Sequence, residues 1–442
     1  MAAEVRLMKT AAELALADAF AAVKSTLPGD AAVAARRAAA FDAFAGTGLP
    51  HRRVESWRYT DLRALLREAP PLAPAPSGEA LARAVVACPM LAGIDARRLY
   101  VVDGAFAPDI SDLAGLEPGL SVTSLAAALA AGGEPVSQIG LTVPSEDAAL
   151  ALNAAFMGDG VVIALADGAS LTRPLHLVFV TTGTVPTATF TRSLMVMGKG
   201  ASALVIESHE GLGGAAYQVN TALEAVVGEG ASLERLKITA EGADALHIST
   251  LLARVAGGAK LANANFTLGG AIVRNQMLVQ LDGEQIDASL SGVSLLAGRQ
   301  HADTMLSVEH IAPNCQSREQ FRTVVDDAAR DIFQGRIAVR PDAQKTDARM
   351  MSRALLLSDT AESDNKPELE IFADDVQCGH GCTTGSLDQQ LKFYMMARGI
   401  PEKEVEALLI QAFVGEVIDA IGHEGVRAAL TDATRNWLIE RK

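Results

Sequence analysis

Gly168-Ala169-Ser170-Leu171 is the first copy of a short motif that decides the fold of this chain. The motif recurs as Gly200-Ala201-Ser202-Ala203, Gly230-Ala231-Ser232-Leu233 and Gly258-Ala259-Lys260-Leu261, at spacings of 32, 30 and 28 residues. Each copy stands between two apolar runs that read as short strands, and a repeat of this length indicates a solenoid. The units carry no helical pattern, which excludes the ankyrin and tetratricopeptide types. We therefore expect a β-helix, in which glycine permits the tight corner and small residues stack from coil to coil. A β-sandwich is the alternative, although its turns recur faster, about every 8 to 12 residues.

Helical and irregular segments flank these strands. Residues 1 to about 66 read as helical, and the first twenty form an amphipathic pattern rather than a secretory signal. The proline-rich run 70–78 predicts an extended linker, and the large side chains of Glu55–Arg63 predict a packing corner. We expect three regions: an N-terminal helical region with its linker (1–95), a β-helix core (96–385) and a C-terminal helical region (386–442).

Composition narrows the class of function. The chain has 442 residues, 49% of them apolar, and a net charge of −15 that argues against nucleic acid as a partner. No apolar run is long enough for a membrane span, so we expect a cytoplasmic protein without a membrane partner. In a reducing compartment, clustered cysteines favour a metal or redox role over a disulfide.

Such a cluster stands at the end of the strand region. Cys378, His380 and Cys382 alternate along the run 376–382, so in a strand they share one face with Val376. Two thiolates and an imidazole are ligands for zinc or for an iron–sulfur centre. Only three ligands are present, so Cys315, His310 or a second chain would have to complete the site. The alternative is that the free cysteines fill the core.

The other candidates for chemistry are weak. His51, His176, His209, His247 and His423 lack cysteine or carboxylate neighbours at a useful spacing, which favours structural or exposed roles. The chain has neither a phosphate-binding loop nor a nucleophile elbow, so it does not resemble a self-sufficient enzyme. After Gly385 an apolar stripe predicts helices that either pack on the core or bind a partner; its members are Val405, Leu408, Leu409, Ala412, Phe413, Val417 and Ala420.

Long stretches of the chain resemble the SufB/SufD family. They are residues 333–358 and 366–400, with HIAPNCQSREQFRTVV upstream (310–325) and ESWRYTDL near the N-terminus (55–62). The Cys-x-His-Gly signature at Cys378 and the Glu-x-Trp-x-Tyr-Thr run at Glu55 favour the SufD branch of that family.

The resemblance implies a right-handed parallel β-helix between two helical regions. It also implies a non-catalytic scaffold for iron–sulfur cluster assembly that pairs with a SufB-type paralogue through the β-helices and binds a SufC-type ATPase through the C-terminal helices. The interface histidine of the family corresponds to His380, beside a transient cluster, and Cys378 corresponds to the cysteine two residues before it. No tightly bound cofactor is expected in the isolated chain, which could instead form a homodimer.

One position departs from the family pattern. Cys382 stands where the family has a small apolar residue, so it is either an additional ligand or a neutral substitution. Two other functions remain open: a stand-alone zinc-binding β-helix protein, and a β-helix enzyme acting on polysaccharide. The low aromatic content, 4%, counts against the latter.

Overall fold

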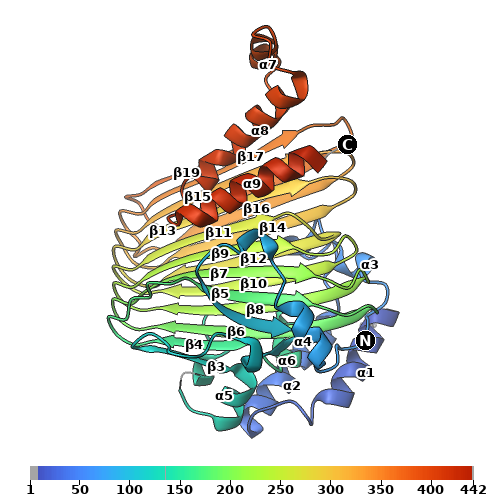
Figure 1. Cartoon of the computed structure of the whole chain (residues 1–442). Coiled ribbons are helices and arrows are strands. Elements are labelled where there is room, and N and C mark those ends of the chain that lie inside the picture. The colour runs from blue at the N-terminus through green and yellow to red at the C-terminus, as the bar shows by residue number, and fades with distance from the viewer. Residues whose placement is uncertain (1–7, 135, 441–442) are drawn as a thin grey trace, which may run out of the picture.

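The computed structural model describes residues 8–134 and 136–440, and its dominant feature is a parallel β-solenoid of about eight turns (Figure 1). Within these residues one sheet runs β19-β17-β15-β13-β11-β9-β7-β5-β1-β2 and the other runs β18-β16-β14-β12-β10-β8-β6-β4-β3; we call them the odd-numbered and the even-numbered sheet after their strands from β4 onward. From β4 onward, successive strands alternate between the two sheets, as the coils of a solenoid require. The expected β-helix is confirmed and the sandwich alternative is wrong.

The strands are short at the start of the fold and nearly uniform in length from β6 onward. Their bounds are β1 (Arg97–Val102), β2 (Ala105–Phe106), β3 (Leu120–Ser124), β4 (Val161–Leu165), β5 (Leu175–Thr181), β6 (Thr187–Met197), β7 (Ser202–Gly211), β8 (Tyr217–Val227), β9 (Ser232–Ala240), β10 (Leu246–Val255), β11 (Lys260–Thr267), β12 (Ile272–Leu281), β13 (Asp287–Leu296), β14 (His301–His310), β15 (Gln316–Val325), β16 (Arg330–Val339), β17 (Asp347–Leu356), β18 (Glu362–Ile371) and β19 (Gln377–Gly385).

The helices lie before and after the regular coils. Their bounds are α1 (Ala11–Val23), α2 (Ala31–Thr47), α3 (Leu62–Leu65), α4 (Gly78–Ala84), α5 (Leu125–Ala131), α6 (Ala148–Phe156), α7 (Gln389–Met396), α8 (Glu402–Ile418) and α9 (Glu424–Glu440).

The repeated motif forms the corners of the coils. Gly200, Gly230 and Gly258 have φ angles of 66°, 65° and 67°, a conformation that favours glycine. The amide of Gly200 donates to the carbonyl of Glu229 in the next coil at 2.8 Å. The alanines after these glycines are fully buried and stack on one another. The sequence period therefore reflects one corner of each coil.

Side chains of alternating residues fill the solenoid interior. Aliphatic and small residues make up most of this core, for example Val205, Leu233, Leu261 and Ala288 in successive odd strands. The low aromatic content of the chain fits this narrow space between two close sheets.

The N-terminal helices cover the outer face of the even-numbered sheet at one end of the solenoid (Figure 1). Trp57 is 1% exposed, and its Nε1 donates to Asp147 at 2.6 Å while the guanidinium of Arg274 lies 4.5 Å from its ring centroid. The packing corner expected at Glu55–Arg63 is thus confirmed. The expected N-terminal helix begins at Ala11, and residues 1–7 lie outside the described residues.

The sequence predicted that the β-helix core begins at residue 96, but helices and strands alternate for some distance after that residue. Helices α5 and α6 fall inside the region assigned to the β-helix core, and the regular coils begin near β4. The proline-rich run is extended, and Leu72 bridges to Ala188 beside the sheet. No helix in the described ranges is long and apolar enough to cross a membrane.

Candidate functional site

Strand β19 is the last strand of the odd-numbered sheet and carries the three residues singled out in the sequence. It pairs in parallel with β17, which places Cys378 beside Ala348, His380 beside Met350 and Cys382 beside Ser352. Ala348 and Met350 belong to the interior core, so alternation directs the three β19 side chains toward the inside of the last coil.

This inner face is incompletely covered because β19 ends the sheet. Cys378 and Cys382 are half-buried and His380 is exposed. Burial is the largest cause that raises the pKa of the Cys378 thiol, and burial likewise raises the pKa of Cys382. In the chain by itself both sulfurs therefore favour the thiol form, and a bound metal would be needed to stabilise the thiolates.

An open groove of about 680 Å³ lies against the end of this strand. Two features distinguish its walls: arginines from neighbouring strands and a glutamate from helix α8. The groove is lined by Gln320, Arg322, Arg349, Met350, Met351, Arg353, Gln377, Cys378, Gly379, His380, Gly381 and Glu416. Arg322 and Arg353 approach Glu416, and Arg349 pairs with Asp347, so the groove is lined by paired charges.

The ligand atoms of Cys378, His380 and Cys382 are not gathered for closed coordination. Among the described residues, the metal-ligating group whose atoms all lie within 4.8 Å is a different one, His209, Glu241 and His247. Residues i and i+2 of an extended strand point to the same side with Cα atoms about 6.6 Å apart, so these side chains would have to reorient to share one ion, and the remaining ligands would have to come from elsewhere.

The structure also excludes Cys315 and His310 as additional ligands of the site on β19. Cys315 is fully buried next to β15, two strands away from β19 and so about 10 Å distant, and its Sγ donates to the carbonyl of Gly283 at 3.0 Å. His310 ends β14 in the other sheet, and its Nε2 lies 3.0 Å from the Ser317 hydroxyl. Neither is placed to ligate an ion held by Cys378 or His380.

Helix α8 connects this edge with the C-terminal helices. Glu416 forms an ion pair with Arg322 of β15, and Gln320 donates to the same carboxylate at 3.3 Å. Arg322 is 1% exposed and lies over the ring of Phe413. The end of α8 is thereby held against the strands that form the groove.

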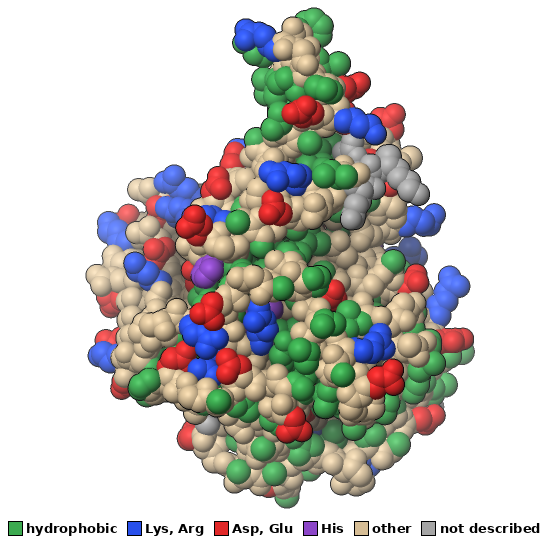
Figure 2. Space-filling view, in the orientation of Figure 1, with side chains coloured by type: hydrophobic (Ala, Val, Ile, Leu, Met, Phe, Trp, Pro, Cys, Tyr) green, Lys and Arg blue, Asp and Glu red, His purple; other side chains and the backbone are tan. Residues whose placement is uncertain are grey.

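The apolar stripe of the C-terminal helices divides between two environments. Val405 and Val417 are buried, and α8 and α9 cover an outer apolar patch of the odd-numbered sheet. Leu408, by contrast, is 42% exposed, so the stripe does not pack inward along its whole length. Helix α7 projects beyond the solenoid and has no buried residue; Figure 2 shows hydrophobic side chains at this tip. Its exposed apolar residues are Leu391, Phe393, Tyr394 and Met396.

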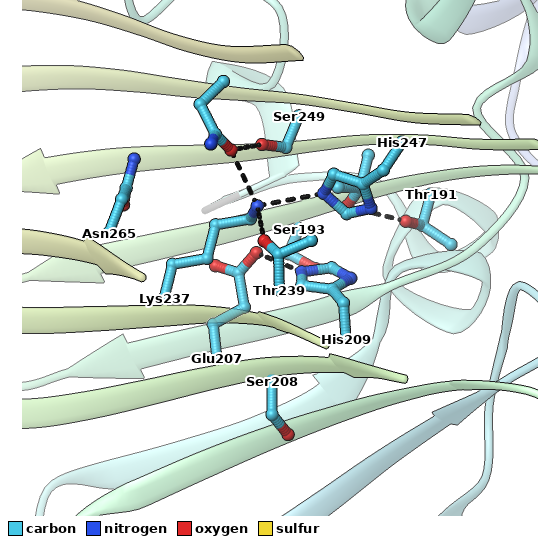
Figure 3. A network of polar contacts seen from close by, with 12 residues as sticks. Thr191, Ser193, Glu207, Ser208, His209, Lys237, Thr239, His247, Ser249 and Asn265 are labelled. Carbon is cyan, nitrogen blue, oxygen red and sulfur yellow. Dashed lines mark hydrogen bonds and ion pairs between the residues drawn. The ribbon is translucent and has the colours of Figure 1, made fainter. Parts of the chain in front are cut away.

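The sequence analysis missed a polar cluster inside the solenoid (Figure 3). His209 and His247 do have carboxylate partners: His209 Nε2 lies 2.7 Å from Glu207, and His247 Nδ1 lies 2.8 Å from Glu241. The signal was the alternation Glu207-x-His209 in one repeat, with Lys237 30 residues later and directly beside Glu207 in the sheet. The contact of His247 with Glu241 across a turn is a property of the folded chain.

Comparison with known proteins gives consistent matches along most of the chain. The model of the SUF system FeS cluster assembly SufBD core domain matches residues 179–413, and the model of the SufBD protein N-terminal region matches residues 12–177. An iron–sulfur cluster assembly protein SufD from Escherichia coli is 31% identical over 393 residues, 86% of this chain and 87% of the relative. A SufBD family protein from Synechocystis is 28% identical over 409 residues, 89% of this chain and 88% of the relative.

Proposed function

This chain belongs to the SufBD family of iron–sulfur cluster assembly proteins, and on that premise we propose that it is a non-catalytic scaffold subunit that pairs with a SufB-type paralogue and binds a SufC-type ATPase. The cluster is the cargo of this complex and is held transiently at the junction of the two β-helices. His380 is the principal ligand or neighbour of the cluster from this chain, and Cys378 is the second.

The observation that carries the proposal is the incomplete ligand face of β19. Thiolates hold iron–sulfur clusters, and imidazole replaces some of them in certain centres. Cys378 and His380 supply part of such a set on a half-covered face, beside a groove rich in arginine. Completion by groups from a second chain suits a cluster that must be released, since a closed four-ligand site would retain its metal.

The open end of the solenoid supports pairing with a second β-helix. Strands β18 and β19 are terminal in their sheets, so within the described residues each has one hydrogen-bonding edge without a strand partner. Such edges are templates for another chain. The paralogue is the proposed partner, and in its absence the same edges would allow two copies of this chain to pair.

The projecting helix α7 supports binding of the ATPase. Phe393 is 75% and Tyr394 53% exposed, which is unusual for aromatic side chains that serve only the fold. Glu416 lies in the following helix and contacts the groove at β19. A partner that displaces α7 and α8 would therefore act close to the cluster ligands.

Reconstitution of the complex tests the proposal. Co-expression with a SufB-type and a SufC-type chain is expected to give a stable assembly, and His380→Ala is expected to lower its iron and sulfide content about tenfold while the three chains still co-purify. Cys382→Ala is the matched control on the same strand, with unchanged cluster content expected. If the chains do not associate, the scaffold role is wrong; if His380→Ala leaves cluster content unchanged, the ligand role is wrong.

A further inference from the structure

The solenoid interior contains a second group of metal-ligating side chains, far from β19 in the stack of coils. His209 comes from β7, His247 from β10, and Glu241 from the turn after β9. One ligand atom from each residue lies within 4.8 Å of the others, and all three side chains are buried. None of these three residues lies on the terminal strands β18 and β19 or lines the groove beside β19.

The chemistry of the three donors matches a divalent transition ion. Two imidazoles and one carboxylate are a recurrent ligand set for Zn²⁺ and related ions, which leaves one position open. All three donors face the interior of the solenoid rather than solvent, so water does not compete with them for an ion.

The hydrogen bonds of the cluster leave one nitrogen for such an ion. His209 Nε2 contacts Glu207 at 2.7 Å, while His209 Nδ1 has no hydrogen-bond partner among the residues that the structure describes. An unpartnered buried acceptor of this kind destabilises the fold. Coordination would satisfy it without breaking the contact with Glu207.

The remaining ligands already lie close together. His247 Nδ1 is 2.8 Å from Glu241 Oε1, and the rings of His209 and His247 meet edge to face with centroids 4.7 Å apart. Ligand atoms of a tetrahedral site lie about 3.4 Å from one another, so separations that are all within 4.8 Å need to contract by at most about 1.4 Å. The Tyr217 hydroxyl donates to the other oxygen of Glu241 at 2.5 Å and orients this carboxylate.

Lys237 contacts His247 at the ring nitrogen that does not face Glu241. Its Nζ lies 2.9 Å from His247 Nε2, and Figure 3 shows the two groups pointing toward each other. Lys237 Nζ also donates to the Thr239 hydroxyl at 2.7 Å and to Asn275 Oδ1 at 2.9 Å. The lysine is thereby fixed in place and orients the ring of His247 with Nδ1 toward Glu241.

We propose that His209, Glu241 and His247 form a binding site for a divalent transition ion inside the solenoid, separate from the cluster ligands on β19. Because the site is enclosed, the ion enters while the chain folds and is then retained. The bound ion stabilises the fold because it links strand β7, the turn after β9 and strand β10 to one centre.

Metal analysis of refolded protein tests this site. The full chain carrying Cys378→Ser, His380→Ala and Cys382→Ala removes the β19 ligands and serves as the host. Refolded with Co²⁺ and then desalted, the host is expected to retain about one equivalent of metal. Its visible spectrum is expected to lack the intense charge transfer of Co²⁺–thiolate bonds.

Two variants of the host and one matched control complete the test. His209→Asn and Glu241→Gln are each expected to abolish retention, whereas His176→Asn, at another buried histidine, is expected to keep it. Circular dichroism checks that each variant is folded, and Co²⁺ X-ray absorption of the host gives a ligand set that does not depend on any variant. A host without retained metal, retention unaffected by both variants, or an absorption spectrum without imidazole ligands would overturn the proposal.

Discussion

Arg322 in strand β15 forms an ion pair with Glu416 in helix α8, beside the groove that holds Cys378 and His380. The guanidinium is 1% exposed while the carboxylate is 51% exposed, so the pair lies at the boundary between the sheet and the helix. Arg353 approaches the same carboxylate at 4.0 Å. This pair holds the C-terminal helices against the strands that border the groove at β19.

Glu416→Gln should destabilise the fold because it leaves the buried Arg322 without its counter-charge. Breaking a fully buried pair costs about 3–5 kcal/mol, and the exposure of Glu416 reduces the expected loss to about 1–2 kcal/mol. The free energy of unfolding from urea titration measures this loss. Glu404→Gln, at an exposed position of the same helix, should stay within about 0.5 kcal/mol of the parent; equal losses in both variants would contradict a specific role for the pair.

Glu319→Gln should stabilise the protein in a pH-dependent way. Glu319 is 1% exposed and lies directly beside Met350 of the neighbouring strand β17. Met350 in turn lies beside His380 of β19, so Glu319 is two strands away from His380 at the same level of the sheet. Burial raises its pKa from 4.5 to about 7, so the folded state keeps a proton that the unfolded state loses as pH rises through this range. Stability from this group is therefore lost between about pH 4.5 and 7.

The expected gain for Glu319→Gln is at most about 3 kcal/mol at pH 8 and vanishes near pH 4. Urea titrations at the two pH values measure it. Glu284→Gln, at an exposed position, provides the comparison and should show no such dependence. A gain of equal size at both pH values would show that the carboxylate of Glu319 is not perturbed by burial.

Substitution of two exposed phenylalanines should distinguish the two proposed binding surfaces, one for the ATPase and one for the paralogue. Phe393 on α7 is 75% exposed, and Phe372, in the loop between β18 and β19, is 57% exposed. Phe393→Ala should weaken binding of the ATPase by about 2 kcal/mol, roughly thirtyfold, with pairing to the paralogue unchanged. Phe372→Ala should do the reverse. Calorimetry with each purified partner distinguishes these outcomes, and loss of both interactions in either variant would mean that the surfaces are not independent.

The apolar stripe of α8 is buried against the sheet in part and exposed in part. For this reason, point substitutions test the proposed ATPase surface better than deletion of the C-terminal helices does. Removal of α8 and α9 would expose the apolar outer face of the odd-numbered sheet, including Leu236, Phe266 and Val293. A deletion from Leu387 onward would therefore disturb the fold as well as the proposed ATPase surface. The periodicity of α8 alone did not reveal this, because both environments favour the same apolar spacing.

The sequence by itself determined the solenoid, because the repeated motif returns at intervals of 28 to 32 residues, which is the length of one coil. It also determined that Cys378, His380 and Cys382 share a face, since strand alternation is a local property. Tertiary structure alone decided that Cys315 and His310 are too distant to join them and that Arg322 meets Glu416. It also brought His209, Glu241 and His247 together, because such contacts depend on how coils stack and helices dock, which no local pattern encodes.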